Sequence, residues 1–179
     1  MIQILNSKEV SREEIFARAV STVDVTGVCA EIIANVRARG DAALLEYSEK
    51  FDRVTLSSLE VTEAETEEAL SLVEPEFFRI LTEAAENIRA FHEKQVRNSF
   101  IINEKNGVVM GQKILPIERV GLYVPGGTAA YPSTVLMDAI PAKLAGCSEI
   151  VMVTPPGQQG RVNPAILAAA KVAGIDRIF

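Results

Sequence analysis

The chain has 179 residues, of which 48% are hydrophobic and 23% charged, a composition typical of one globular domain or of a domain with an appendage. Its net charge is −6 at pH 7 and no cluster of lysine or arginine stands out, so we expect neither a nucleic-acid partner nor an anionic membrane partner. Residues 1–20 carry several charges and no apolar run is long enough to span a bilayer, which favours a cytoplasmic protein without a signal peptide.

Residues 1–98 predict a helical region. Ser11–Glu14 and Thr62–Glu65 each have a hydroxyl followed three residues later by a carboxylate, the pattern of a capping box at the start of a helix. Apolar residues recur at helical spacing up to Gly40, where we expect a helix to end and Asp41 to begin the next. Pro75 suits the first turn of the longest helix, because its missing N–H costs nothing there.

Residues 99–119 predict a β-hairpin and a linker. Two short segments rich in apolar residues flank Asn106-Gly107, and this dipeptide is the strongest short signal for a hairpin turn. The chain becomes poor in charged residues after the hairpin. We therefore place the boundary between two regions of the chain at residues 99–119.

Residues 120–179 predict an incomplete Rossmann-like domain of the type that binds NAD. Apolar strand-like runs alternate with two helix-like segments in the order strand, helix, strand, helix, strand. The fold class is therefore α/β: a helical region and a β-hairpin, then an incomplete Rossmann-like β-α-β-α-β parallel half-sheet whose strands we expect to be buried on both faces. Because the sequence stops inside the third strand, Ile175–Phe179, we expect a truncated piece of a longer protein, with an exposed edge that favours self-association.

The turn after the first of these strands, Tyr123–Thr128, is the candidate ligand site. It lies at the carboxyl edge of the predicted sheet, where parallel sheets bind ligands, and its adjacent glycines allow close approach of a backbone. The spacing is not G-x-G-x-x-G, and the second strand ends in Thr154-Pro155-Pro156 instead of an acidic residue that would hold a ribose. The residues alone leave two alternatives open: a ligand such as a nucleotide stacked on Tyr123 or Pro125, or a purely structural turn.

No complete catalytic constellation or metal site emerges from these residues. Ser133 and Thr134 precede a helix, so we interpret them as N-cap residues and not as nucleophiles. The only histidine, His92, lies beside the apolar stripe of a helix, and we expect a partly buried structural role for it. Cys29 and Cys147 lie in no metal or redox motif, so we expect both to be buried in a protein of a reducing compartment.

Five segments of the chain occur together, in this order, in one known family. They are Arg39–Asp52, Val120–Thr128, Pro132–Met137, Pro141–Cys147 and Ile150–Pro156. Through them the chain resembles histidinol dehydrogenases over essentially its whole length. Intact members of that family are much longer, so the resemblance is to the N-terminal portion of the family's chain.

The resemblance implies a zinc-requiring, NAD-dependent oxidoreductase of histidine biosynthesis, which oxidises L-histidinol through L-histidinal to L-histidine. It also implies a cytoplasmic homodimer whose active site draws on both subunits. By this resemblance Tyr123 and Pro125 match positions that contact NAD, and Gly126 beside them lets the dinucleotide lie close. The family's zinc ligands and acid/base residues lie beyond residue 179, so we assign no catalytic or metal residue to this chain and expect it to be inactive alone.

Two other hypotheses stay open. The chain could be a non-catalytic module for folding and dimerisation that binds nothing, or it could be part of another dehydrogenase with a related half-sheet, for example one that acts on an aldehyde. Binding of NAD that is lost in Tyr123→Ala would favour a retained cofactor surface over the module.

Overall fold

The structure is a computed structural model that describes residues 4–6, 8–16, 24–126, 129–157 and 159–179 and divides into two units, residues 1–40 and 41–179. The first unit holds helices α1 (Arg12–Phe16) and α2 (Thr26–Arg39), and no described residue of either helix is buried. The Glu14 N–H donates to the Ser11 hydroxyl at 3.1 Å, which is one half of the predicted capping box. α2 ends as predicted at Gly40.

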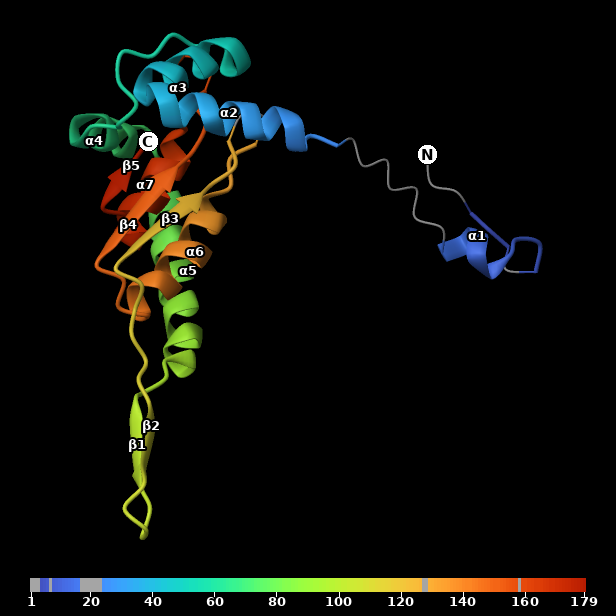
Figure 1. Cartoon of the computed structure of the whole chain (residues 1–179). Helices are drawn as coiled ribbons and strands as arrows, with labels where there is room; N and C mark the ends of the chain where they lie inside the picture. Colours follow the sequence, from blue (N-terminus) through green and yellow to red (C-terminus); the bar gives the residue numbers. More distant parts are fainter. Residues whose placement is uncertain (1–3, 7, 17–23, 127–128, 158) are drawn as a thin grey trace. The chain divides into compact units, whose positions relative to one another are not determined.

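The second unit begins with helical segments, as predicted (Figure 1). They are α3 (Asp41–Tyr47), η1 (Ser48–Asp52), α4 (Glu63–Leu72), α5 (Pro75–His92) and η2 (Glu93–Gln95). The predicted capping box starts α4: the Thr62 hydroxyl accepts from the Glu65 N–H at 3.2 Å, and the Glu65 carboxylate accepts from the Thr62 N–H at 2.8 Å. Pro75 occupies the first turn of α5, which buries Leu81 and Ala85.

Two separate sheets follow. β1 (Phe100–Asn103) and β2 (Val109–Gln112) form the predicted antiparallel hairpin, and all of their residues are exposed. β3 (Arg119–Tyr123), β4 (Glu149–Val153) and β5 (Arg177–Ile178) form a parallel sheet in the order β3-β4-β5, joined through α6 (Pro132–Leu144) and α7 (Pro164–Ala173). The predicted α/β fold class is confirmed.

The core lies on one face of the parallel sheet, where α6 and α7 pack (Figure 1). Ile150 and Met152 of β4 are fully buried on this face, whereas Tyr123 and Val153 on the opposite face are exposed. The prediction that the strands are buried on both faces is therefore wrong within the described residues. Because β3, β4 and β5 are neighbours in chain order, right-handed crossovers place both connecting helices on the same side.

Two predictions about single residues are corrected. α6 begins at Pro132 with Tyr131 as its N-cap, so Ser133 and Thr134 lie in the first turn and are not caps. The reason is that Pro132, with its fixed φ, occupies the first helical position. Cys29 is exposed on α2, a helix without a described buried residue, and Cys147 is half-buried, so neither cysteine is buried as predicted.

The outer edge of β5 is paired in part within the second unit. The Val61 N–H donates to the Ile178 carbonyl at 2.9 Å, and the Arg177 guanidinium donates to both oxygens of Glu60 at 2.7 and 2.9 Å. The segment before α4 thus covers some of the edge that the sequence predicted to be exposed. Among the described residues, no helix has both the length and the apolarity needed to cross a membrane.

Candidate functional site

The predicted corner lies at the carboxyl end of β3. Tyr123 is 65% exposed, whereas the next residue, Val124, is fully buried. The Val124 N–H donates to the Val153 carbonyl at 3.0 Å, which continues the pairing of β3 with β4 beyond Tyr123. Since side chains alternate between the faces of a strand, the phenol of Tyr123 lies on the open face of the sheet.

Gly126 packs against the loop that follows β4. A Cβ at this position would lie 3.0 Å from both the Cγ and the carbonyl oxygen of Pro155, closer than ordinary van der Waals contact. Pro125 and Gly126 are both half-buried, and the second glycine of the corner, Gly127, lies with Thr128 outside the described residues. Packing against Pro155 is therefore one physical reason for glycine at position 126, besides access to a ligand.

A small cavity of about 30 Å³ lies beside Gly126. It is bounded by the end of β4 and the start of α7, including Thr154, Pro155 and Asn163. Such a volume accommodates about one water molecule. Any larger ligand at this corner therefore lies over Tyr123 and not inside the cavity.

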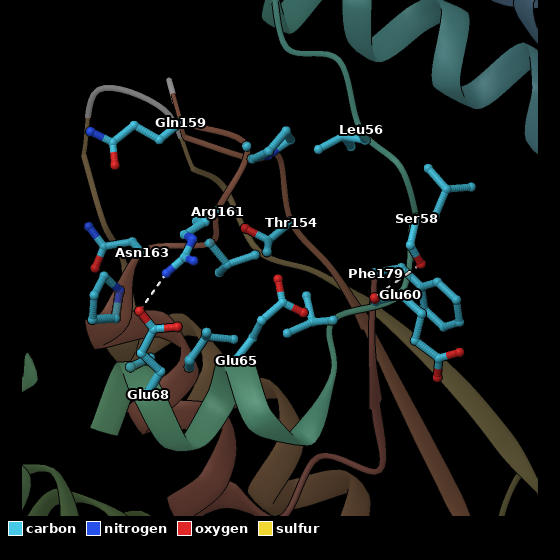
Figure 2. Close-up of a pocket in the computed structure, with 18 of the residues that line it drawn as sticks. Leu56, Ser58, Glu60, Glu65, Glu68, Thr154, Gln159, Arg161, Asn163 and Phe179 are labelled. Atoms are coloured by element: carbon cyan, nitrogen blue, oxygen red, sulfur yellow. Dashed lines mark hydrogen bonds and ion pairs between the residues drawn. The ribbon is translucent and has the colours of Figure 1, made fainter. Parts of the chain in front are cut away.

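A much larger cavity of about 500 Å³ lies at the carboxyl ends of β4 and β5, between α4, the start of α7 and the segment that precedes α4 (Figure 2). We call it the Thr154 cavity. Apolar side chains form much of its wall, namely Leu56, Val61, Ala69, Leu72, Val162 and Leu167. Thr154 also lines the small cavity, so this one residue connects the corner to the larger space.

The four charged side chains that line the Thr154 cavity are Glu60, Glu65, Glu68 and Arg161, and each is engaged. The Arg161 guanidinium lies 2.6 Å from a Glu68 oxygen, and this hydrogen bond raises the pKa of Arg161 (Figure 2). The backbone and hydroxyl of Thr62 hold the pKa of Glu65 below its ordinary value. The hydrogen bonds from Arg177 do the same for the pKa of Glu60.

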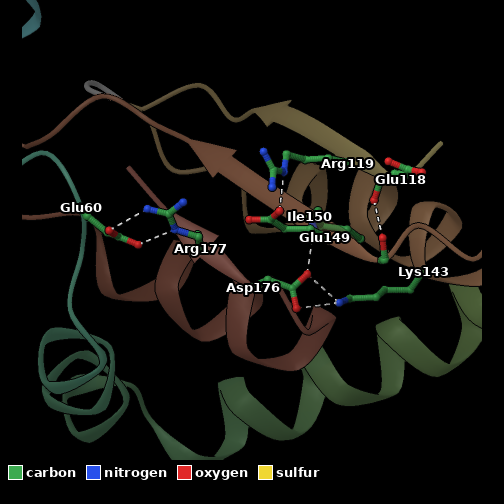
Figure 3. Close-up of polar contacts among 9 residues, drawn as sticks. Glu60, Glu118, Arg119, Lys143, Glu149, Ile150, Asp176 and Arg177 are labelled. Carbon is green, nitrogen blue, oxygen red and sulfur yellow. Dashed lines mark hydrogen bonds and ion pairs between the residues drawn. The ribbon is translucent and has the colours of Figure 1, made fainter. Parts of the chain in front are cut away.

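The opposite, amino-terminal edge of the sheet carries a polar network that is structural (Figure 3). Asp176 accepts hydrogen bonds from Lys143 Nζ at 2.9 Å and from the Ile150 N–H at 2.7 Å. Burial alone would raise the pKa of Asp176, but these two hydrogen bonds outweigh it and lower the pKa below its ordinary value. Arg119 forms an ion pair with Glu149 at the same edge.

The described residues contain no group of three or more histidine, cysteine, aspartate or glutamate side chains that could hold a metal ion. His92 is half-buried, as expected, and its Nδ1 lies 2.6 Å from the Gln95 side-chain oxygen. This contact serves to hold the end of α5. His92 also borders a groove of about 430 Å³ with mostly apolar walls, including Leu115, Pro116 and Leu144.

The structure brings Tyr123, Pro125 and Gly126 together at the end of β3, and none of them lines the Thr154 cavity. The sequence shows that β4 runs into Thr154 and two prolines, but it indicates no role for the threonine. The signal in the sequence that could have pointed to Thr154 is a hydroxyl side chain directly after the apolar run 150–153. One side of the Thr154 cavity comes from α4 and the segment before it, and Glu68 of α4 bonds to Arg161 across a separation of 93 residues. No local pattern at Thr154 indicates that these segments lie beside it.

Comparison with known proteins gives one consistent family. The family model described as histidinol dehydrogenase matches residues 17–179. Histidinol dehydrogenase from Clostridium acetobutylicum is 54% identical over 148 residues, which cover 83% of this chain and 34% of the relative. The enzyme of that name from Methanosarcina barkeri is 46% identical over 172 residues, covering 96% of this chain and 40% of the relative.

A solved structure shows the same similarity. The crystal structure of histidinol dehydrogenase from Elizabethkingia anophelis matches with a TM-score of 0.86 and 38% identity, over 90% of this chain and 37% of that chain. The chain therefore spans between a third and two fifths of the length of the two curated relatives.

Proposed function

The chain belongs to the histidinol dehydrogenase family and corresponds to its N-terminal portion, and from this premise we propose that it supplies part of the NAD surface of an enzyme of histidine biosynthesis. The reaction proposed for the whole enzyme is the oxidation of L-histidinol through L-histidinal to L-histidine. A cytoplasmic homodimer is part of the same proposal. Family membership favours this function over a different dehydrogenase that acts on an aldehyde.

The observation that carries the proposal is the exposed ring of Tyr123 at the carboxyl end of a parallel strand. Ligands of open α/β sheets bind at this edge, and a free aromatic face there can stack on a planar base or nicotinamide ring. Pro125 limits the backbone next to the ring, and Gly126 keeps the approach free of a side chain. These residues fit a dinucleotide that lies on the surface of the sheet edge.

Zinc does not fit the residues that the structure describes. No described group of candidate ligands is large enough, and a zinc site uses three or four side chains. We therefore derive no step through zinc. In the proposed enzyme the metal ligands and the acid/base residues come from outside the described residues.

When bound, NAD would supply the hydride acceptor, with one NAD molecule needed for each of the two oxidations. The contribution of this chain is to bind and orient the cofactor. Tyr123 would hold one of its rings by stacking, and the half-buried Pro125–Gly126 backbone would set the distance of the dinucleotide from the sheet. We assign no proton transfer to any residue that the structure describes.

Titration calorimetry with NAD tests the proposal. We expect saturable binding by the unmodified chain, about tenfold weaker binding by Tyr123→Ala, and near-normal binding by Tyr123→Phe, which keeps the ring. Tyr131→Ala is the matched control, because Tyr131 is also an exposed tyrosine and lies just before α6 as its N-cap. Purified chain given L-histidinol and NAD should form no NADH.

The control outcomes separate the hypotheses. Absence of NAD binding by the unmodified chain would leave only the folding and dimerisation module. Equal weakening in Tyr123→Ala and Tyr131→Ala would remove the stacking role of Tyr123. Formation of NADH by the pure chain would show that the reaction needs no residue from outside it.

A further inference from the structure

Thr154 is buried, and its side chain carries a hydroxyl. The residue is 7% exposed, and its N–H donates to the Phe179 carbonyl at 3.0 Å. Among the described residues, none hydrogen-bonds the side-chain hydroxyl of Thr154, and none of their fully buried side-chain polar atoms lacks a partner. The hydroxyl therefore reaches the surface of a cavity that Thr154 lines, and of the two such cavities the larger one, the Thr154 cavity, has room for an occupant that could bond to it (Figure 2).

The charges around the cavity do not favour a charged occupant. Glu60 and Glu68 already pair with arginines, and Glu65 is held by the capping box of α4. The guanidinium of Arg161 is committed to Glu68 and more than half of its side chain is exposed, so it does not present a free cation to the interior. An ion placed against the apolar wall would lose hydration without gaining a free counter-charge.

The shape and lining of the cavity suit a small ring. Its volume of about 500 Å³ lies in the range of small-molecule sites, which combine apolar walls with a few polar groups. Phe179 lines the cavity, and the Arg177 guanidinium lies 4.8 Å from the centroid of its ring. Arg177 thereby helps to fix the Phe179 ring, against which a planar molecule can pack.

We propose that the Thr154 cavity is a binding site for a small, uncharged heteroaromatic molecule that exchanges one hydrogen bond with the Thr154 hydroxyl. The apolar wall supplies contact area, Phe179 supplies an aromatic surface, and Thr154 fixes the orientation of the ring. Tyr123, Pro125 and Gly126 do not line this cavity, so the site adds to the proposed NAD surface and does not depend on it.

Indole is a suitable probe, because it is an uncharged heteroaromatic ring with one N–H donor. The chain has no tryptophan, so the fluorescence of added indole is not masked by the protein. We expect saturable binding of indole, with NMR shifts at Thr154, Val162 and Phe179. Indole-3-carboxylate and tryptamine, which carry opposite charges, should each bind at least about tenfold more weakly.

Thr154→Val removes the hydroxyl and keeps the shape of the side chain. We expect it to weaken indole binding about five- to tenfold. We also expect the midpoint of urea unfolding to stay unchanged or to rise, since the hydroxyl has no hydrogen-bond partner among the described residues. With 1-methylindole, which lacks the N–H, Thr154→Val should change affinity little. Thr134→Val, at a half-buried threonine of α6 outside the cavity, is the matched control.

Several results would overturn the assignment. They are absence of saturable binding, equal binding of the charged analogues, equal loss in Thr154→Val and Thr134→Val, and displacement of indole by NAD. A lower unfolding midpoint in Thr154→Val would likewise show that the hydroxyl serves the fold and not a ligand. Because the unfolding measurement needs no ligand, it tests the role of Thr154 even if another ring is the natural occupant.

Discussion

A methyl group at position 126 has no free space. Its carbon would lie 3.0 Å from the carbonyl oxygen of Pro155, a backbone atom that cannot rotate away. We expect Gly126→Ala to lower the free energy of unfolding by about 1–3 kcal/mol, the usual cost of overpacking. Urea unfolding followed by circular dichroism measures this loss.

Gly121→Ala is the control for that substitution. Gly121 lies in β3, the strand that leads into the turn with Gly126, and a Cβ at Gly121 would meet nothing within 4 Å. Alanine in a strand interior costs less backbone entropy than glycine, so we expect no loss of stability. If Gly121→Ala and Gly126→Ala were equally destabilising, the close approach to Pro155 would not explain the glycine.

The residues of the candidate sites differ in how far sequence could predict them. Tyr123, Pro125 and Gly126 form a continuous turn, so one local pattern indicates all three. Thr154 becomes notable only because α4 and the segment before it close a cavity around its side chain. Burial of a threonine by residues distant in the chain leaves no periodic or spacing signal near the threonine itself.

At the scale of elements, Asp176 joins three of them. It follows α7, precedes β5, and accepts hydrogen bonds from Lys143 of α6 and from the Ile150 N–H of β4 (Figure 3). The folded protein holds the pKa of Asp176 below its ordinary value of 3.8. The ionised carboxylate therefore contributes stability above about pH 4, and this contribution is lost as the pH falls below 3.8 through the lower folded pKa.

Asp176→Asn tests this connection. At pH 7 we expect Asp176→Asn to lower the free energy of unfolding by about 1 kcal/mol. The loss is small because water screens the partly exposed ion pair of Asp176 with Lys143. At pH 3 the two proteins should differ less in their free energy of unfolding, measured by urea. Asp138→Asn, at an exposed aspartate of α6, is the control. If the stability difference between the original chain and Asp176→Asn stayed constant with pH, the effect would come from side-chain geometry and not from the charge of Asp176.

Signals at the ends of elements predicted the fold well. The capping box at Thr62 and the proline at the start of α5 each act within one helical turn, so they are visible in the sequence. The open face of the parallel sheet was missed for a different reason. Short apolar strands have similar sequences whether one face or both are covered, and only the positions of α6 and α7 decide between these cases.

At the scale of the whole molecule, the main hydrophobic core belongs to the second unit. Its buried members begin with Ala69 and end with Ile178, and they include Val135, Leu136 and Ile140 of α6. In the first unit, by contrast, neither α1 nor α2 has a described buried residue. The apolar surface whose burial stabilises the fold is therefore supplied almost wholly by residues after Gly40.

A chain of residues 41–179 should consequently fold by itself. We expect its urea unfolding to stay cooperative. Its free energy of unfolding should fall by less than about 1 kcal/mol relative to the full chain, since no described residue of α1 or α2 is buried. Leu136→Ala in the full chain calibrates the measurement: it truncates a fully buried side chain of the core and should cost about 2–5 kcal/mol. If the deletion lowered the free energy of unfolding as much as Leu136→Ala does, residues 1–40 would unfold together with residues 41–179 as one cooperative unit. Binding of NAD and of indole would then be a property of the full chain and not of residues 41–179 alone.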